Sequence, residues 1–206
     1  MKTVKSLNRV LLATLATAAL AGGLSACAPL VVGGAALTGL VAVDRRSSGA
    51  QLEDETIELR AGSRLRDALG SRSHINVTSY NRQVLLTGEV PDEAAKARAE
   101  QVVAGLDNVR TVVNELAIMA PTSLSQRSND ALISGKMRAS LVDARDLSST
   151  AFKVVTERST IFLMGRVTQR EADRATEVTR NVSGVKRVVR VLEIITEDEL
   201  KRLQPG

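Results

Sequence analysis

Cys27 is the residue whose chemistry is easiest to assign in this chain. It is the only cysteine, so the chain holds no second thiol with which it could form a disulfide. It follows Leu24-Ser25-Ala26, and an apolar run from Val10 to Leu24 lies before it, with three basic residues in front of that run. A basic n-region, an apolar h-region and a small-residue cleavage site predict a secretory signal peptide over residues 1–26.

The tetrapeptide Leu24-Ser25-Ala26-Cys27 resembles the bacterial lipobox. This resemblance implies cleavage before Cys27, acylation of its thiol and new N-terminus, and a lipid-anchored protein that faces the periplasm. Ala28 is not the aspartate that resembles an inner-membrane retention signal, so we expect the outer membrane. The alternatives are a buried thiol and a transmembrane helix. The apolar run, however, is about 15 residues long, and a spanning helix needs roughly 20.

No other residues form a recognisable catalytic or metal-binding pattern. The single histidine, His74, precedes an expected strand and is interpreted as a surface turn residue. The acidic run Glu53-Asp54-Glu55 is interpreted as charge that complements a helix N-terminus rather than as a catalytic carboxylate pair. We therefore expect no enzyme, no cofactor and no metal site.

Composition argues against a nucleic-acid partner. Without residues 1–26 the chain keeps 25 Lys and Arg against 23 Asp and Glu, so its net charge falls from +5 to +2. The chain has no Trp, one Tyr and two Phe, which leaves few rings on which bases could stack. Residues 27–50 are expected to form the lipidated end and a flexible tether. Its apolar part, 30–43, is too short to span a bilayer and could instead lie at the membrane interface.

The rest of the chain contains an internal repeat at an offset of 76 or 77 residues. Ile57, Ala61 and Leu65 align with Ile133, Met137 and Leu141, and Val84–Val90 aligns with Ile161–Val167. The expected domains are 51–119 and 128–195, with a linker over 120–127 and a short helical C-terminal tail over 196–206. Two copies are too few for a solenoid.

Each copy predicts the element order αββαβ, which is an α+β fold with two helices on one face of a small mixed sheet. The first helix has its apolar residues at i, i+4 and i+8, and its expected caps are Asp54 or Glu55 in one copy and Ser128 or Asn129 in the other. Hairpin turns are expected at Asn81-Arg82 and Arg158-Ser159. The second helix follows Pro91-Asp92 in the first copy, and Thr168 with Glu171 in the second copy fits a capping box. The last strand is expected over Val109–Ile118 or Val185–Ile195.

Gly88 and Gly165 occupy the same place in the second strand of both copies. Glycine inside a strand weakens it, so its recurrence indicates close backbone approach or a bulge. We interpret both glycines as packing requirements rather than ligand contacts.

This pattern resembles the BON domain (bacterial OsmY and nodulation). The resemblance rests on the Asn76-Val77-Thr78 strand, on Val84–Gly88 with Ile161–Gly165, and on the Gly184-Val185 start of the last strand. A lipobox followed by two such domains resembles dual-BON outer-membrane lipoproteins. The resemblance implies binding to anionic phospholipid membranes and support of envelope integrity.

The two copies differ in charge, which favours the second as the membrane-binding one. Residues 51–119 carry a net charge of −3 and residues 127–195 a net charge of +5. Leu132, Lys136 and Arg138 are the candidate membrane-binding residues, because an exposed leucine beside basic side chains suits anionic headgroups. In the enterobacterial lipoproteins that this chain resembles, an aromatic residue stands where Leu132 stands here. Two alternatives remain: the arginines only make the domain soluble, or the protein is an envelope adaptor that binds another protein.

Overall fold

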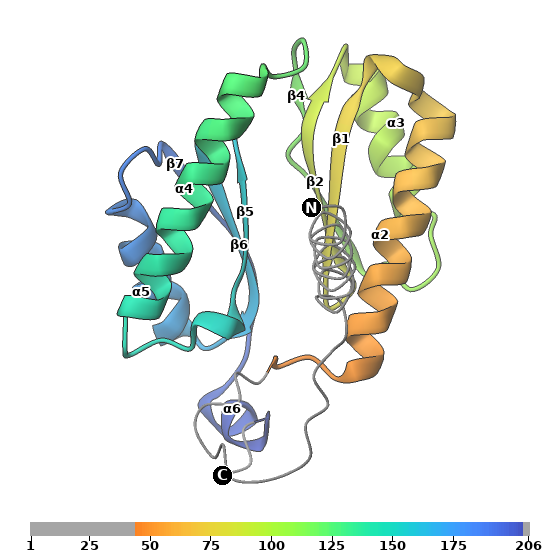
Figure 1. Cartoon of the computed structure of the whole chain (residues 1–206). Coiled ribbons are helices and arrows are strands. Elements are labelled where there is room, and N and C mark those ends of the chain that lie inside the picture. Colours follow the sequence, from red (N-terminus) through yellow and green to blue (C-terminus); the bar gives the residue numbers. More distant parts are fainter. Residues whose placement is uncertain (1–43, 204–206) are drawn as a thin grey trace, which may run out of the picture. The chain divides into compact units, whose positions relative to one another are not determined.

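The computed structural model describes residues 44–203, which form two copies of the same α+β unit (Figure 1). The predicted signal peptide, Cys27 and the tether up to residue 43 lie outside the described residues. Within 44–203, no helix is both long enough and apolar enough to cross a membrane. The helices of the described part are α2 (Ser48–Leu69), α3 (Glu93–Ala104), α4 (Leu124–Asp143), α5 (Gln169–Arg180) and α6 (Glu197–Leu203), with 3₁₀ turns η2 (Gly70–Arg72) and η3 (Ser149–Ala151).

Each copy builds a mixed sheet around a central strand, which confirms the predicted α+β class. In the first copy β1 (His74–Tyr80) pairs antiparallel with β2 (Gln83–Val90), and β2 pairs in parallel with β3 (Thr111–Asn114) and β4 (Ala117–Ile118). In the second, β5 (Lys153–Glu157) pairs antiparallel with β6 (Thr160–Val167), and β6 pairs in parallel with β7 (Arg187–Ile194). The last strand of the first copy, predicted as one piece, is interrupted at Glu115-Leu116, where Leu116 turns into the core at 2% exposure.

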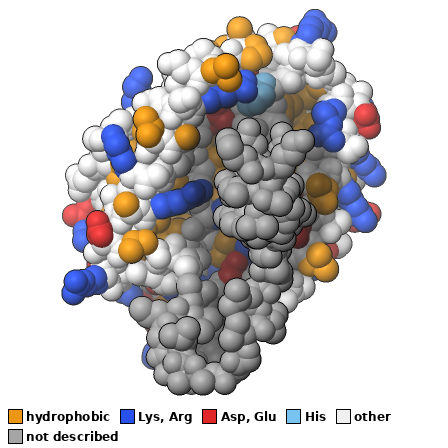
Figure 2. Space-filling view, viewed as in Figure 1, with side chains coloured by type: hydrophobic (Ala, Val, Ile, Leu, Met, Phe, Trp, Pro, Cys, Tyr) orange, Lys and Arg blue, Asp and Glu red, His pale blue; other side chains and the backbone are white. Residues whose placement is uncertain are grey.

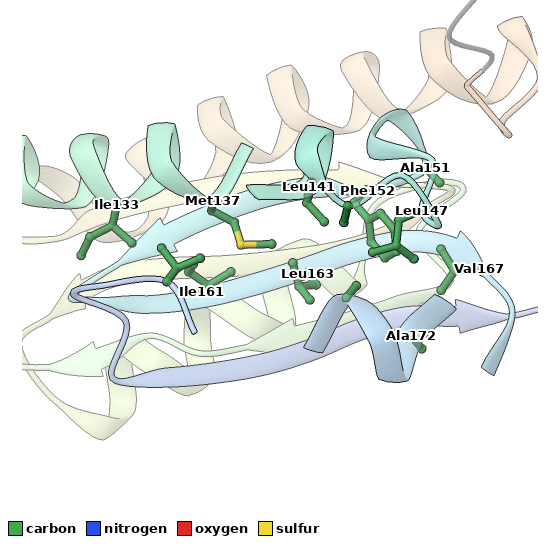
Figure 3. Packing of buried hydrophobic residues seen from close by; sticks show 13 residues of the cluster. Ile133, Met137, Leu141, Leu147, Ala151, Phe152, Ile161, Leu163, Val167 and Ala172 are labelled. Carbon is green, nitrogen blue, oxygen red and sulfur yellow. The ribbon is translucent and has the colours of Figure 1, made fainter. Parts of the chain in front are cut away.

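Two helices cover one face of each sheet, as predicted. Ile57, Ala61 and Leu65 of α2 pack with Ala99 and Val103 of α3 against β2. Figure 3 shows the equivalent core of the second copy, where Ile133, Met137 and Leu141 of α4 lie over Ile161 and Leu163 of β6. Apolar burial of this kind stabilises each unit by roughly 25 cal/mol per Å².

The opposite faces of the two sheets pack against each other. Tyr80 and Leu85 from the first sheet form one buried cluster with Phe162, Met164 and Val191 from the second. Polar contacts surround this cluster: Arg158 Nη1 donates to Glu89 Oε1 at 2.9 Å, and Lys153 Nζ donates to Glu58 Oε1 at 2.8 Å. The helices of the two copies therefore lie on the outer sides of a pair of stacked sheets.

Both first helices begin earlier than predicted. The N-cap of α2 is Ser47, whose Oγ accepts from the Ala50 amide, and the N-cap of α4 is Ser123, whose Oγ accepts from the Gln126 amide. The predicted caps at Asp54 or Glu55 and at Ser128 or Asn129 are wrong, because these residues lie inside the helices. The expected starts of the second helices are confirmed: α3 begins directly after Pro91-Asp92, with Asp92 as its N-cap, and Thr168 forms the predicted capping box with Glu171 on α5.

Asp54 has a different role from the helix-terminal charge predicted for it. It lies two turns into α2 and is buried, and its carboxylate accepts from the backbone amides of Asn81 and Arg82 at 2.7 and 2.8 Å. Asp130 on α4 repeats this arrangement with the amides of Arg158 and Ser159, both at 2.8 Å. All four turn residues have positive φ angles, between 49° and 65°. Each aspartate therefore fastens a helix to the tight turn of the adjacent hairpin.

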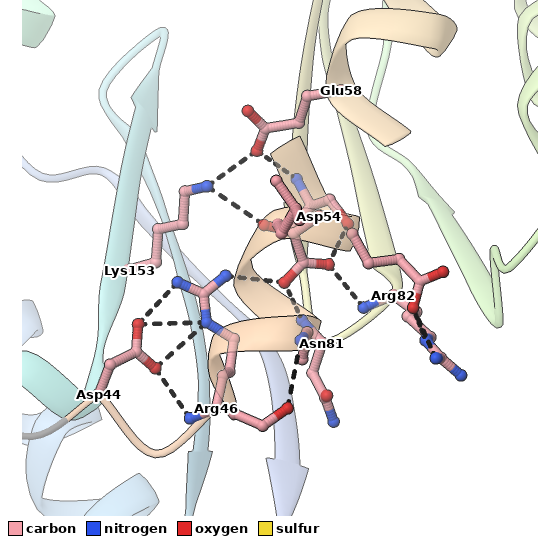
Figure 4. A network of polar contacts seen from close by, with 12 residues as sticks. Asp44, Arg46, Asp54, Glu58, Asn81, Arg82 and Lys153 are labelled. Carbon is pink, nitrogen blue, oxygen red and sulfur yellow. Dashed lines mark hydrogen bonds and ion pairs between the residues drawn. The ribbon is translucent and has the colours of Figure 1, made fainter. Parts of the chain in front are cut away.

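The residues just before α2 belong to the folded body, so the tether does not extend to residue 50 as predicted. We call Asp44–Ser47 the strap. Arg45 is 2% exposed and forms a bidentate pair with Glu171 at 2.7 and 2.8 Å. Figure 4 shows the neighbouring Arg46, which bonds to Asp44 and Asp54. The strap thus contacts the first copy through Arg46 and the second through Arg45.

Gly88 and Gly165 both lie where another backbone segment passes close by. A Cβ atom on Gly88 would lie 2.0 Å from the His74 carbonyl oxygen, and one on Gly165 would lie 2.3 Å from that of Ala151. Gly88 also has a φ of 111°, which side-chain-bearing residues rarely adopt. Neither position leaves room for a side chain.

His74 is the first residue of β1 rather than a surface turn residue. Its Nδ1 lies 3.3 Å from Oε2 of Glu89, whose side chain is fully buried. The same carboxylate forms an ion pair with Arg158 of the second copy. His74 is therefore part of the contact region between the two sheets.

Candidate membrane-binding surface

The outer side of α4 is the surface that contains the predicted membrane-binding residues. Ile133, Met137 and Leu141 form its buried stripe. Because successive residues turn by about 100° around a helix axis, a face opposite this stripe points away from the sheet, whereas Ser134 beside the stripe bonds to Thr156 of β5. At the start of the helix, the amide of Gln126 donates to Ser123 Oγ at 3.2 Å.

The structure exposes all three predicted residues and places Leu132 beside Lys136, with Arg138 on the other side of the exposed face. The side chain of Leu132 is 67% exposed. Lys136 is also exposed, and its Nζ lies 2.9 Å from Ser183 Oγ in the loop after α5. Arg138 is exposed and has no ionic partner among the described residues. Lys136 and Arg138 point about 160° apart around the helix, so they flank the exposed face from opposite sides.

Sequence reasoning missed two exposed aliphatic residues on the same face. Leu124 is 80% exposed and Val142 is 66% exposed. They are five helical turns apart, about 27 Å along the axis, and share one angular position. Leu124 was missed because the helix was expected to begin after it. Small residues occupy the face between them: Ser128, Ala131, Gly135 and Ala139.

From Leu124 to Val142 this face has exposed basic but no exposed acidic side chains, and the exposed Asp143 ends the helix. Between Leu124 and Val142 the one acid is Asp130, which is 5% exposed and bonded to the hairpin turn. Arg127, Lys136 and Arg138 are exposed basic residues of the same helix. In the space-filling view, hydrophobic and basic side chains are interspersed on the side of the molecule where α4 lies, with some acidic side chains at its edge (Figure 2).

Such a surface can lie flat on an anionic membrane. Aliphatic side chains of an interfacial helix enter the boundary between headgroups and acyl chains. Each Lys or Arg near the anionic surface contributes roughly 1 kcal/mol. The small residues between Leu124 and Val142 let the helix backbone approach the headgroups closely.

The buried titratable groups serve the fold rather than this surface. Burial opposes ionisation of Asp54 and Glu171, but their hydrogen bonds outweigh it and lower the pKa of both carboxyl groups: Ser79, Arg82 and Arg46 bond to Asp54, and Arg45 and Thr168 bond to Glu171. Burial, and next the charge of nearby Glu89, raises the pKa of Glu157, which lies between the two sheets. Among residues 44–203, no three His, Cys, Asp or Glu side chains are grouped as metal ligands would be.

Comparison with known proteins places these observations in a family. The model of the BON domain matches residues 53–120 and 129–196. The chain is 35% identical over 175 residues to the outer membrane lipoprotein DolP of Haemophilus influenzae, covering 84% of this chain and 90% of that protein. It is 36% identical over 155 residues to a 21 kDa hemolysin of Actinobacillus pleuropneumoniae, covering 74% and 80%.

Solved structures add no functional information. The C-terminal domain of CdsD, a structural protein of the type III secretion system of Chlamydia trachomatis, aligns with 65% of this chain and 96% of its own length. Its TM-score is 0.29 at 11% identity. This similarity is too low to support a functional conclusion.

Proposed function

Since the chain belongs to the BON-domain family and is an outer-membrane lipoprotein, we propose that it binds anionic phospholipid surfaces through the outer face of α4 and so supports envelope integrity. In this proposal the protein is not an enzyme. The acyl chains on Cys27 hold it at the outer membrane, and the second BON domain makes a further, reversible contact with lipid headgroups.

The observation that carries this proposal is the composition of the exposed face of α4. It combines Leu124, Leu132 and Val142 with basic flanks and has no exposed acid before Asp143. A face made only for solubility needs no aliphatic side chains at 66–80% exposure. The net charge of +5 over residues 127–195, against −3 over residues 51–119, supports the same choice of domain.

The length of chain before the strap supports contact with the membrane that holds the anchor. Sixteen residues lie between Cys27 and Asp44, and a fully extended chain covers at most about 3.5 Å per residue. The body can therefore lie within roughly 60 Å of the anchored cysteine. At that distance a weak headgroup contact is strengthened by the high effective concentration of lipid.

Vesicle co-sedimentation of residues 44–206 tests this proposal without the acyl anchor. We expect binding to vesicles that contain phosphatidylglycerol or cardiolipin, and little binding to phosphatidylcholine alone. Lys136→Glu with Arg138→Glu should lower the partition constant by at least about 30-fold, because two attractive contacts of roughly 1 kcal/mol each are lost. Leu132→Asp should lower it roughly tenfold through lost apolar insertion, and the binding that this variant loses should depend less on salt.

The matched control is Arg60→Glu with Arg64→Glu on α2, which makes the same charge change in the first domain. This control should bind vesicles like the unchanged protein. If it weakens binding as much as the α4 variants do, only the bulk charge matters and the proposal that α4 forms the lipid contact is wrong.

The second candidate function is that of an envelope adaptor that binds another protein. The acidic first domain favours it, since a net charge of −3 does not suit contact with an anionic membrane. If residues 44–206 fail to bind any anionic vesicle, the adaptor becomes the better account.

A further inference from the structure

The outer side of α2 carries an exposed stripe that the lipid-binding proposal does not use. We call Leu52, Glu55, Leu59, Gly62 and Arg66 the α2 stripe. Their spacing of three, four, three and four residues is the a/d spacing of helices that pair along their length. Leu52 is 66% exposed and Leu59 is 76% exposed. These are unusual values for leucines two turns apart on one helix face.

The charged members of the stripe have no partners within the described part of the chain. Glu55 and Arg66 are exposed, and neither takes part in an ion pair or side-chain hydrogen bond there. Two other acids of the same helix are paired: Glu53 accepts from Arg82 Nε at 2.7 Å, and Glu58 accepts from Lys153 Nζ at 2.8 Å. Glu55 and Arg66 are thus two exposed charges of opposite sign with no partner among residues 44–203.

Gly62 has no side chain, so the helix backbone is accessible at this position of the stripe. A Cβ atom there would meet only the tip of the flexible Arg66 side chain, at 3.4 Å. It has no close backbone neighbour, unlike Gly88 and Gly165. Small residues of this kind let a large side chain of a second helix approach the backbone.

We propose that the α2 stripe pairs antiparallel with the α2 stripe of a second copy of this chain. One register pairs four of its five members: Glu55 meets Arg66 of the second copy, and Leu59 lies on Gly62 of the second copy. In the same register Leu52 lies opposite Leu69 of the second copy, which is partly buried against its own core. A two-fold axis repeats each contact, so one helix face supplies two ion pairs and two leucine contacts on glycine.

This pairing is compatible with lipid binding by α4. The α2–α3 core and the α4–α5 core lie on opposite outer sides of the stacked sheets. An interface confined to one helix from each copy is smaller than the roughly 1,200 Å² of a stable complex. We therefore expect weak association in solution and stronger association when lipid anchors concentrate the copies on a membrane.

Charge exchange between two variants tests the register. In the mature lipoprotein, reconstituted in phosphatidylcholine vesicles with donor or acceptor dyes on the C-terminus, the unchanged protein should show energy transfer that rises with surface density. Glu55→Arg alone and Arg66→Glu alone should each lower this association several-fold, because each places like charges opposite one another twice. A mixture of the two variants should regain the original level, since in every mixed pair both contacts again join an arginine to a glutamate.

A control and two further results decide the outcome. Arg64→Glu makes the same charge change as Arg66→Glu but lies outside the stripe, so it should associate like the unchanged protein, and thermal melts should confirm that all variants are folded. The proposal is overturned if the unchanged protein shows no transfer above random mixing, or if the mixture does not recover. It is also overturned if Leu52→Asp with Leu59→Asp weakens binding to anionic vesicles but not energy transfer, because the stripe would then be a lipid contact.

Discussion

At the residue scale, the pair Asp54 and Asp130 explains how each domain holds its hairpin. Both carboxylates accept two backbone amides of a tight turn whose residues have positive φ angles. Such turns are costly for residues other than glycine, so the aspartate compensates by satisfying donors that the turn leaves unpaired. The offset of 76 between the two aspartates equals the repeat offset of their helices. That shared offset was the signal that could have revealed their common role.

Replacing Asp54 with Asn should destabilise the protein by about 3 kcal/mol at neutral pH, because Arg46 loses its buried partner and a turn amide its acceptor. The folded-state pKa of Asp54 is lowered, so its stabilisation is present above its unfolded pKa of about 3.9 and is lost as the pH falls through the folded value. The difference in melting temperature between Asp54→Asn and the unchanged protein should therefore shrink in acid. Exposed Asp67→Asn is the control and should melt like the unchanged protein at each pH.

At the element scale, another backbone segment passes so close to the middle strand of each sheet that one strand position has no room for a side chain. β2 passes the His74 carbonyl at Gly88, and β6 passes the Ala151 carbonyl at Gly165. The two glycines differ in backbone conformation, because only Gly88 has a positive φ. Close approach is thus the feature that both copies share.

Gly88→Val and Gly165→Val should each destabilise the protein by roughly 1–3 kcal/mol through overpacking. Gly88→Val should cost more, because its backbone must also leave a conformation that valine avoids. Chemical denaturation measures both effects. Gly135→Ala on α4, where a Cβ atom meets nothing within 4 Å, should instead stabilise the helix by up to about 1 kcal/mol. Unchanged unfolding of both valine variants would refute the packing interpretation.

At the scale of the whole molecule, the strap connects the end of the tether to both domains. Arg45 bonds to Glu171 and to the Arg166 carbonyl in the second domain. Arg46 pairs with Asp54 in the first domain and lies 4.4 Å from the centre of the Tyr80 ring. The chain that leads to the lipid anchor therefore leaves from a point held by the folded body.

Cys27→Ala should leave an unprocessed precursor without acyl chains, because the lipobox cysteine is the residue that the modification requires. The measurement is mobility on a gel together with membrane fractionation, with the unchanged protein alongside. A variant that still runs at mature size and fractionates with the outer membrane would show that Cys27 is not the anchor.

The amino-acid sequence alone determined the element order, the duplication, the buried stripes and the α5 capping box. These follow from local spacing: i, i+4 and i+8 for Ile57, Ala61 and Leu65, and a Thr168–Glu171 pair three residues apart. The exposure of Leu132 also followed, because it lies beside a residue of the buried stripe.

The tertiary structure alone decided which polar residues bond to partners that are distant in the sequence. Asp54 looked like a helix cap because its partners, the turn amides at residues 81 and 82, are distant in sequence. Arg45 looked like part of a flexible tether because its partner Glu171 lies 126 residues away. Local patterns report the period of a helix or strand, whereas a buried charge is stable only where folding brings its partner to it. The exposed stripe on α2 and the face of α4 likewise became visible only once the two cores had shown which sides of these helices remain uncovered.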